Sequence, residues 1–191
     1  MKRRILLLLI FLAPLIPVSV LAQQFAVRTN LVPIADGALN AGVEYALGRR
    51  STVDLSGMVR PWRRTEKYVN KYWLVQPEYR YWTCQKFNGT YWGAYLNGAQ
   101  FNVGGKDMPF GLFPWLERHR YEGWLAGVGV SWGYHLMLDR HWNLEFSAGV
   151  GYEYIHYRKY ETPEVCTPLL EEGHYHYFGL SKLSASIVYV F

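Results

Sequence analysis

The sequence predicts an all-β protein, an eight-stranded antiparallel transmembrane β-barrel of the outer-membrane type, preceded by a cleaved signal peptide. Three observations predict it: an N-terminus laid out as a signal peptide, alternation of apolar and polar residues along most of the remaining chain, and aromatic residues that recur ten positions apart on the apolar side. The chain has 191 residues, 50% of them hydrophobic, and two cysteines. This composition excludes a disordered chain and a small scaffold held together by disulfides.

Residues 1–22 form the expected signal peptide, and residues 23–191 form one barrel domain. Three basic residues, Lys2 to Arg4, precede an apolar run that ends on Val20-Leu21-Ala22, a small-residue cleavage pattern. No later apolar run is long enough for a transmembrane helix. The whole chain carries a formal charge of +5, but without the signal peptide 17 Lys and Arg face 15 Asp and Glu, which leaves +2. Export and near-neutrality together argue against nucleic acid as a partner.

Alternation with a period of two predicts the strands. In the clearest case the even positions from Trp142 to Tyr154 are apolar, whereas the odd positions are polar or glycine. The expected strands cover residues 24–33, 39–48, 51–62, 72–84, 91–102, 124–135, 142–154 and 175–191. The segment 91–102 alternates least clearly, and we expect a β-bulge at Gly98 there.

The spacing of aromatic residues favours a membrane barrel over a water-soluble, lipocalin-like one. Trp124 and Tyr134, like Trp142 and Tyr152, lie ten residues apart on the apolar face. Ten residues of a tilted strand rise about 25 Å, roughly the height of the apolar band between the two aromatic girdles of an outer-membrane barrel. A water-soluble barrel would turn its apolar face inward. We therefore expect these four residues to belong to aromatic girdles on the outer wall.

Loop lengths predict the orientation. Short connections at 48–51, 84–90 and 138–141 alternate with longer ones at 62–71, 102–120 and 157–174, although the first outward connection, near Asp36-Gly37, is also brief. Short turns of such barrels are periplasmic, so we expect an outer-membrane protein with both termini in the periplasm. The C-terminal Phe191 on an alternating strand resembles the signal read by the outer-membrane assembly machinery, an expected partner.

The inward positions carry charges. Eight strands leave an interior that side chains can fill, and buried charges need partners. We expect a structural ionic network in the lumen, and hairpin symmetry places Arg28 opposite Glu44 and Asp54 opposite Arg80. The proposed network consists of Arg28, Glu44, Asp54, Glu78, Arg80, Glu145 and Lys182. A narrow channel is the alternative interpretation.

Basic and aromatic residues gather near the expected outer loops. Cations there can pair with lipopolysaccharide phosphates, and aromatic rings can anchor the interface or contact a surface protein. Ordinary solvation of the loops and packing over the barrel mouth are equally good alternatives. The candidate outer-rim residues are Arg63, Arg64, Phe110, Phe113, Trp115, Arg118, Arg120, Arg158 and Lys159.

The sequence offers no convincing catalytic set. A lipid A-modifying enzyme is the main alternative function, and it would need a serine and a histidine with an orienting carboxylate at one membrane interface. His156 and the nearby Glu153 lie on opposite faces of their strand, while Ser131 and His135 face the lumen. We therefore expect no enzymatic activity and no cofactor.

Metal binding is a further hypothesis. Histidines near the outer ends of the last strands could form a site, but no cysteine or carboxylate is clearly placed to join them, so we expect no metal. These histidines are His119, His156, His174 and His176. Cys84 and Cys166 fall at opposite ends of the barrel, too far apart for a disulfide.

Several sequence blocks resemble a Bacteroidota family of small outer-membrane barrels that is catalogued as a domain of unknown function. The similarity spans most of residues 24–191, and the architecture is similar to OmpX and OmpA-type barrels. The blocks are GVEYALGRRSTVDLSG, WLVQPEYRYW, QFNVGG, YEGWLAGVGVSWGY, RHWNLEFSAGVGYEY and YFGLSKLSASIVYVF. The resemblance implies an envelope role near surface fibres, such as fimbriae, and assigns no catalytic residues. Relatives carry a cysteine pair in the last outer loop, where this chain has only Cys166. We expect a closed barrel with a structural or interaction role in the envelope.

Overall fold

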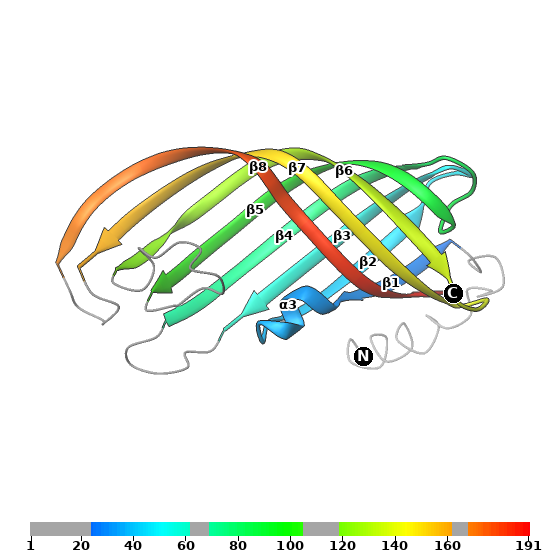
Figure 1. The fold of residues 1–191 in the computed structure, drawn as a ribbon, viewed down its shortest axis with the longest axis horizontal. Helices are drawn as coiled ribbons and strands as arrows, with labels where there is room; N and C mark the ends of the chain where they lie inside the picture. The colour runs from blue at the N-terminus through cyan, green and yellow to red at the C-terminus, as the bar shows by residue number, and fades with distance from the viewer. Residues whose placement is uncertain (1–23, 62–68, 105–118, 162–167) are drawn as a thin grey trace, which may run out of the picture.

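The computed structural model describes residues 24–61, 69–104, 119–161 and 168–191. These residues form one antiparallel sheet of eight strands in sequence order, and pairing of the first strand with the last closes the sheet into a barrel (Figure 1). The prediction of an all-β antiparallel fold is thereby confirmed. The strands are β1 (Phe25–Asn30), β2 (Leu39–Ala46), β3 (Ser51–Arg60), β4 (Val69–Trp82), β5 (Gly89–Gly104), β6 (Arg120–Met137), β7 (Trp142–Tyr160) and β8 (Leu169–Val190).

The first strand is shorter than expected, because residues 31–33 do not continue it. They belong to a short helix, α3 (Leu31–Ala35), that packs beside β8. The side chain of Asn30 caps this helix by accepting a hydrogen bond from the backbone N–H of Val32 at 3.1 Å, and Pro33 has no N–H for a strand ladder. Among the described residues, no helix has the length and apolar character needed to cross a membrane.

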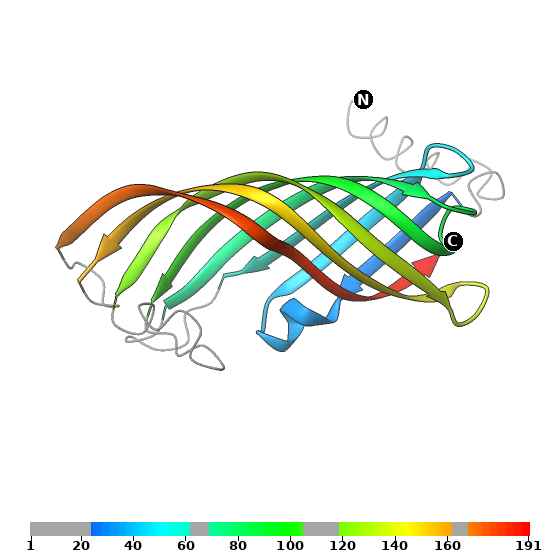
Figure 2. The ribbon, with the colours of Figure 1, turned by 45° about the horizontal axis from the view of Figure 1, so that its top comes forward.

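The two ends of the barrel differ. β1 starts where β8 ends, since the N–H of Phe191 donates to the carbonyl of Phe25 at 3.0 Å, and the connections β2–β3, β4–β5 and β6–β7 turn at this same end. Strand length rises from 6 residues in β1 to 22 in β8. At the opposite end, therefore, β4 to β8 project beyond β1 to β3 as a curved sheet (Figure 2). We call this part the projecting sheet.

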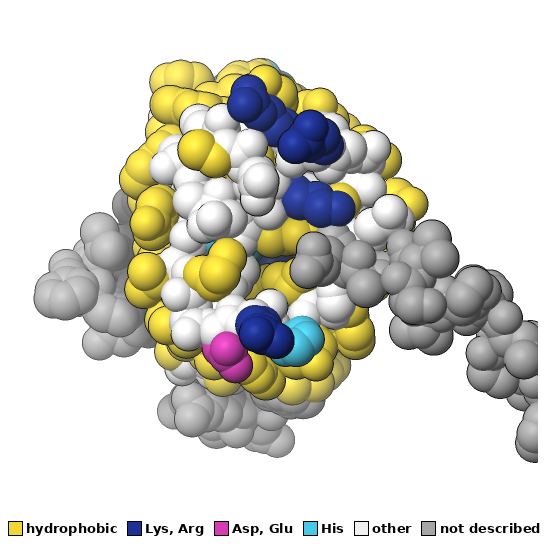
Figure 3. Space-filling view, turned by 90° about the vertical axis from the view of Figure 1, so that its right-hand side faces the viewer, with side chains coloured by type: hydrophobic (Ala, Val, Ile, Leu, Met, Phe, Trp, Pro, Cys, Tyr) yellow, Lys and Arg dark blue, Asp and Glu magenta, His cyan; other side chains and the backbone are white. Residues whose placement is uncertain are grey.

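The burial pattern is inverted relative to a water-soluble protein. Val130 and Leu183 on the outer wall are 57% and 58% exposed, whereas Arg80 and Glu145 on the inner wall are 0% exposed. Figure 3 looks at the end with the short connections, where hydrophobic side chains line most of the outline and several Lys or Arg side chains lie among polar groups and backbone within it. The four expected girdle residues, Trp124, Tyr134, Trp142 and Tyr152, are all exposed on that wall.

Large inward rings pack against inward glycines. A Cβ atom on Gly129 would lie 2.4 Å from the ring of Tyr95, and one on Gly133 would lie 2.4 Å from the ring of Tyr91. Both tyrosines are buried on the inner face of β5. Since β5 therefore carries apolar side chains on both faces, its alternation was unclear in the sequence.

The expected bulge at Gly98 is wrong. The β4–β5 register is the same on both sides of this position, with Val75 opposite Gly98 and Glu78 opposite Tyr95, so no extra residue is inserted. Irregularities lie in β8 instead, where Leu170 and Ser181 each have no register partner between two consecutive β7 residues. Consequently the outward positions of β8 are odd-numbered on one side of Ser181 and even-numbered on the other.

Candidate functional site

Arg80 lies at the centre of a buried cluster of charges inside the barrel. Its Nη1 donates to Glu44 Oε2 at 2.7 Å and its Nε donates to Glu78 Oε2 at 2.8 Å. Nη1 and Nη2 each donate to one oxygen of Glu145 at 3.1 Å. The guanidinium also stacks on the ring of Tyr91, 4.5 Å from the ring centre. One side chain of β4 thus joins carboxylates from β2, β4 and β7.

Arg28 and Lys182 extend this cluster to the strands that close the barrel. Arg28 donates from Nε to Asp54 Oδ1 at 2.9 Å and from Nη1 to Glu145 Oε1 at 3.0 Å. Lys182 donates to Glu78 Oε2 at 2.6 Å. The structure therefore brings all seven residues of the expected lumen network into one connected set, which we call the lumen network.

The expected cross-strand partners within this network are wrong by two residues. Gly42, not Glu44, is the register partner of Arg28, and Glu78, not Arg80, is that of Asp54. The pairing centres each hairpin one residue earlier than expected, and a displacement of one residue in the centre of a turn changes every cross-strand partner by two. A shift of two residues keeps every side chain on the same face, so the charges still meet through their long side chains.

Neutral donors complete the network. Its seven residues contain three cations and four carboxylates. The hydroxyl of Tyr91 donates to Glu145 Oε1 at 2.9 Å, Thr52 donates to Glu44, and Ser131 donates to Glu78. His135 Nε2 lies 2.9 Å from Glu145 Oε2. With these contacts, every carboxylate oxygen of the network has a hydrogen-bond partner, as buried charge requires.

Sequence reasoning placed Ser131 and His135 in the lumen but did not assign them to the network, and it missed Thr52 and Tyr91 altogether. The signal for His135 was available, since it shares the inward parity of Ser131 and Gly133. No such signal existed for Tyr91, because β5 alternates poorly.

Three buried residues have the chemistry of a metal site. Ligand atoms of Glu44, His135 and Glu145 lie within 4.8 Å of one another. The Arg80 guanidinium, however, already lies between the two carboxylates, with Nη1 2.7 Å from Glu44 and 3.1 Å from Glu145. A cation is thus already present where a metal would bind, and the arrangement is an ion-pair network.

A second polar cluster lies closer to the projecting sheet. Asp36, just after α3, accepts from Arg60 Nη1 at 2.5 Å and from the hydroxyl of Tyr72 at 3.4 Å. Asn70 Nδ2 lies 3.4 Å from the same Asp36 oxygen. The cluster joins the α3–β2 connection to β3 and β4 above the lumen network.

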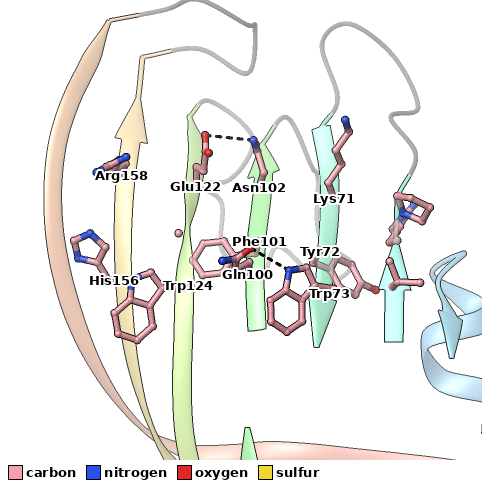
Figure 4. A pocket seen from close by; sticks show the side chains of 14 residues that line it. Lys71, Tyr72, Trp73, Gln100, Phe101, Asn102, Glu122, Trp124, His156 and Arg158 are labelled. Carbon is pink, nitrogen blue, oxygen red and sulfur yellow. Dashed lines mark hydrogen bonds between the residues drawn. The ribbon is translucent and has the colours of Figure 1, made fainter. Parts of the chain in front are cut away.

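The projecting sheet carries a pocket of about 530 Å³ (Figure 4). Trp73 and Trp124 border it, and Trp73 Nε1 donates to Gln100 at 3.1 Å. Two residues farther along β5 and β6, Asn102 donates to Glu122 at 3.4 Å, and Lys71 and Arg158 lie on the two sides of this pair. A row of aromatic rings is therefore followed by a row of polar and charged groups.

Most of the expected outer-rim residues, namely Arg63, Arg64, Phe110, Phe113, Trp115 and Arg118, lie outside the described residues. The guanidinium of Arg120 lies over the ring of Tyr160 at 4.3 Å. Arg158 is exposed, and its Nε lies 3.4 Å from Glu172. Lys159 is half-buried.

The inner face of the projecting sheet is lined partly by tyrosines. Tyr121 and Tyr157 pack at 6.0 Å between ring centres, and the hydroxyl of Tyr157 donates to Glu171 at 3.3 Å. Slight burial and the neighbouring Glu171 carboxylate raise the pKa of Tyr157 above its ordinary value.

The described residues define a closed antiparallel barrel with an apolar outer wall and an interior filled by ion pairs. A family model described as "Protein of unknown function (DUF3575)" matches residues 6–191, and the chain belongs to that family. The expected membership of a domain family of unknown function is thereby confirmed. Neither a curated protein nor a solved structure matches the chain.

Proposed function

We propose that the protein is a small, closed barrel of the bacterial outer membrane with a structural or interaction role in the envelope. The observation that carries this proposal is the inverted burial, with valine and leucine exposed on the wall and seven charged side chains enclosed by it. Exposed apolar area of this extent is costly in water, whereas a lipid bilayer solvates it. A closed sheet also leaves few unpaired backbone groups to face lipid.

The distribution of rings on the wall supports the same proposal. Trp124 packs against Tyr154 at 5.6 Å near the projecting sheet. At the other end Trp142 packs against Tyr189 at 5.1 Å, and Phe25 against Phe191 at 6.4 Å. Two belts of rings separated by an apolar band, about 25 Å tall in outer-membrane barrels, mark the two interfaces of the membrane. In this arrangement the end with the short connections faces the periplasm.

Cysteine labelling in cells tests both membrane insertion and orientation. Cys84 is exposed at the proposed periplasmic end, and the proposal assigns Cys166 to the cell surface. In C84S the remaining cysteine should react with a membrane-impermeant maleimide on intact cells. In C166S, Cys84 should react only after the outer membrane is permeabilised. The opposite pattern, or recovery of the protein in a soluble fraction, would refute the proposal.

The lumen network also predicts that the barrel does not conduct. Arg80 and Glu145 are fully buried in mutual ion pairs across the interior, and these side chains fill the narrow lumen expected of eight strands. Planar-bilayer recordings of the purified protein should show no stable conductance steps. Stable, large steps would favour the alternative function, a narrow channel.

The interaction role rests on the open edge of β8. Its ladder with β1 ends at Ser186, and the N–H of Ala185 donates to the side chain of Asn30 at 3.2 Å. Beyond this point the described part of β8 has register partners on β7 alone. An open strand edge is a template for another strand. We infer that an extended segment of a surface protein pairs with it by strand addition.

A second copy of the chain fits this edge poorly. Copies in one membrane share one orientation, so a two-fold axis between them runs along the membrane normal. Strands tilted by roughly 40° from that axis would cross rather than run side by side.

A photocrosslinker at Tyr175 in intact cells should capture one surface protein, and its captured segment should protect β8 amides from hydrogen exchange. Protection elsewhere, with β8 unprotected, would refute strand addition.

Lipopolysaccharide is the other proposed contact. The polar row with Lys71 and Arg158 follows the aromatic row with Trp73 and Trp124 in the direction away from the lumen. Cations at headgroup level pair with phosphates. Lipopolysaccharide retained by the purified barrel should therefore decrease in a K71Q/R158Q variant, and unchanged retention would exclude this contact.

Lipid A from a deletion strain should keep its acylation pattern; an altered pattern would favour the alternative, a lipid A-modifying enzyme.

A further inference from the structure

Two histidines of the projecting sheet face each other across neighbouring strands. His156 of β7 and His174 of β8 are register partners. His156 extends from the outer face beside Trp124, with the two ring centres 6.0 Å apart. Side chains directly opposite each other on one face have their Cβ atoms about 4.5–5.5 Å apart, so both imidazoles can reach a common point between the strands.

A carboxylate lies next to this pair. Glu172 is two residues from His174 and therefore on the same face of β8. Its Oε1 lies 3.2 Å from Nε2 of His156. Two ligand atoms about 2.0–2.1 Å from a tetrahedral Zn²⁺ are about 3.3 Å from each other. The separation of these two atoms is thus compatible with coordination of one ion.

We propose that His156, His174 and Glu172 form a binding site for one divalent transition-metal ion such as Zn²⁺ on the outer face of the β7–β8 pair. Two imidazoles and one carboxylate suit such an ion better than Mg²⁺ or Ca²⁺, which prefer oxygen ligands. The fourth position of a tetrahedral ion is left to water or to a side chain of a bound partner.

Two contacts compete with the metal. The ring of His174 stacks on Tyr154 at 6.0 Å and 20°, so it must change rotamer to reach the ion. Arg158 Nε lies 3.4 Å from Glu172 and must release it. Both are exposed contacts of low energy. At the buried set Glu44, His135 and Glu145, by contrast, a metal ion would have to displace the Arg80 guanidinium, which is enclosed with these residues.

The site has a structural consequence. At this height β8 pairs with β7 alone among the described strands, so a metal held by both would cross-link the projecting hairpin. Hydrogen exchange of β8 amides should therefore slow when Zn²⁺ is added. The proposal depends on register and side-chain chemistry, and it stands independently of where the protein resides.

Calorimetry with Zn²⁺ tests the site on the full mature chain in detergent, without a histidine tag and in a C84S/C166S background. The unaltered site should bind one Zn²⁺ per chain. H156Q, H174Q and E172Q should each weaken binding at least tenfold, and H156Q/H174Q should abolish it. H141Q is the matched control, because His141 stacks on Tyr189 at the opposite end at 5.7 Å and should leave binding unchanged.

Circular dichroism and the heat-dependent mobility of the barrel on gels establish that each variant is folded. Electron paramagnetic resonance of bound Cu²⁺ gives a second readout, with coupling to two imidazole nitrogens expected in the parent and none in the double histidine variant. Absence of binding by the parent would overturn the proposal. So would binding by H156Q/H174Q that equals that of the parent.

Discussion

Replacing Arg80 by methionine should destabilise the barrel more than any other single change in the lumen network. The side chain is fully buried and contacts Glu44, Glu78 and Glu145 at 2.7 to 3.1 Å. Methionine has a similar length but offers no donor, so the three carboxylates lose their common partner. Removing one partner of a buried ion pair costs about 3–5 kcal/mol, and we expect a loss of stability at or above that range.

Charge counting sharpens this prediction. The network contains three cations and four carboxylates, so R80M changes its formal charge from −1 to −2. Adding E145Q to R80M restores −1 and removes the carboxylate that Arg80 contacts with two nitrogens. The double variant should therefore be more stable than R80M alone. R80K keeps the charge but lacks the planar fork of donors, and it should fall between R80M and the parent protein.

Urea unfolding in lipid vesicles, followed by tryptophan fluorescence, measures these differences. R158M is the matched control, because Arg158 makes an exposed ion pair with Glu172 at 3.4 Å and such pairs contribute about 0–1 kcal/mol. If R80M loses no more stability than R158M, or if E145Q worsens R80M, the lumen network does not hold the barrel together as argued.

Three further outcomes are expected from the same unfolding assay. G129A should cost about 1–3 kcal/mol by overpacking, since its Cβ would lie 2.4 Å from a tyrosine ring, whereas G98A, with nothing within 4 Å, should be near neutral; equal effects would contradict the described packing. Y91F removes a hydrogen bond of 2.9 Å to Glu145 and should cost about 1.5–3 kcal/mol, and an unchanged midpoint would argue against that bond. V130R places a cation on the exposed wall and should cost about 2–4 kcal/mol in lipid; a neutral effect would refute a lipid-facing wall.

The faces of the strands could be predicted from the sequence because alternation is a local property. Five of the seven charges in the network have an apolar neighbour on both sides, and Arg28 and Lys182 have one on one side, so parity places them inside. The pairing could not be predicted as well. Arg28 meets Gly42 in register because the first hairpin turns one residue earlier than expected, within a connection that contains α3, and a five-residue helix with a proline leaves little periodicity to detect.

The residues of the candidate metal site could be predicted only in part from the sequence. Its two histidines were visible in the sequence, but Glu172 fell in an expected loop, because the last strand was predicted to begin at residue 175. The structure extends β8 back to Leu169 and thereby places Glu172 beside His156. Only the long-range pairing of β7 with β8 identifies the third ligand.

The joint between the first and last strands has a consequence for how the protein acquires its shape. β1 contributes only 6 residues, and its pairing with β8 extends from Ala26–Val190 to Asn30–Ser186. These partners are the most distant in the chain, so bringing them together carries the largest loop-closure entropy. The other seven ladders join strands that are neighbours in the chain and can form first. The β1–β8 ladder would then form last, and it would be the first to separate when the barrel is destabilised.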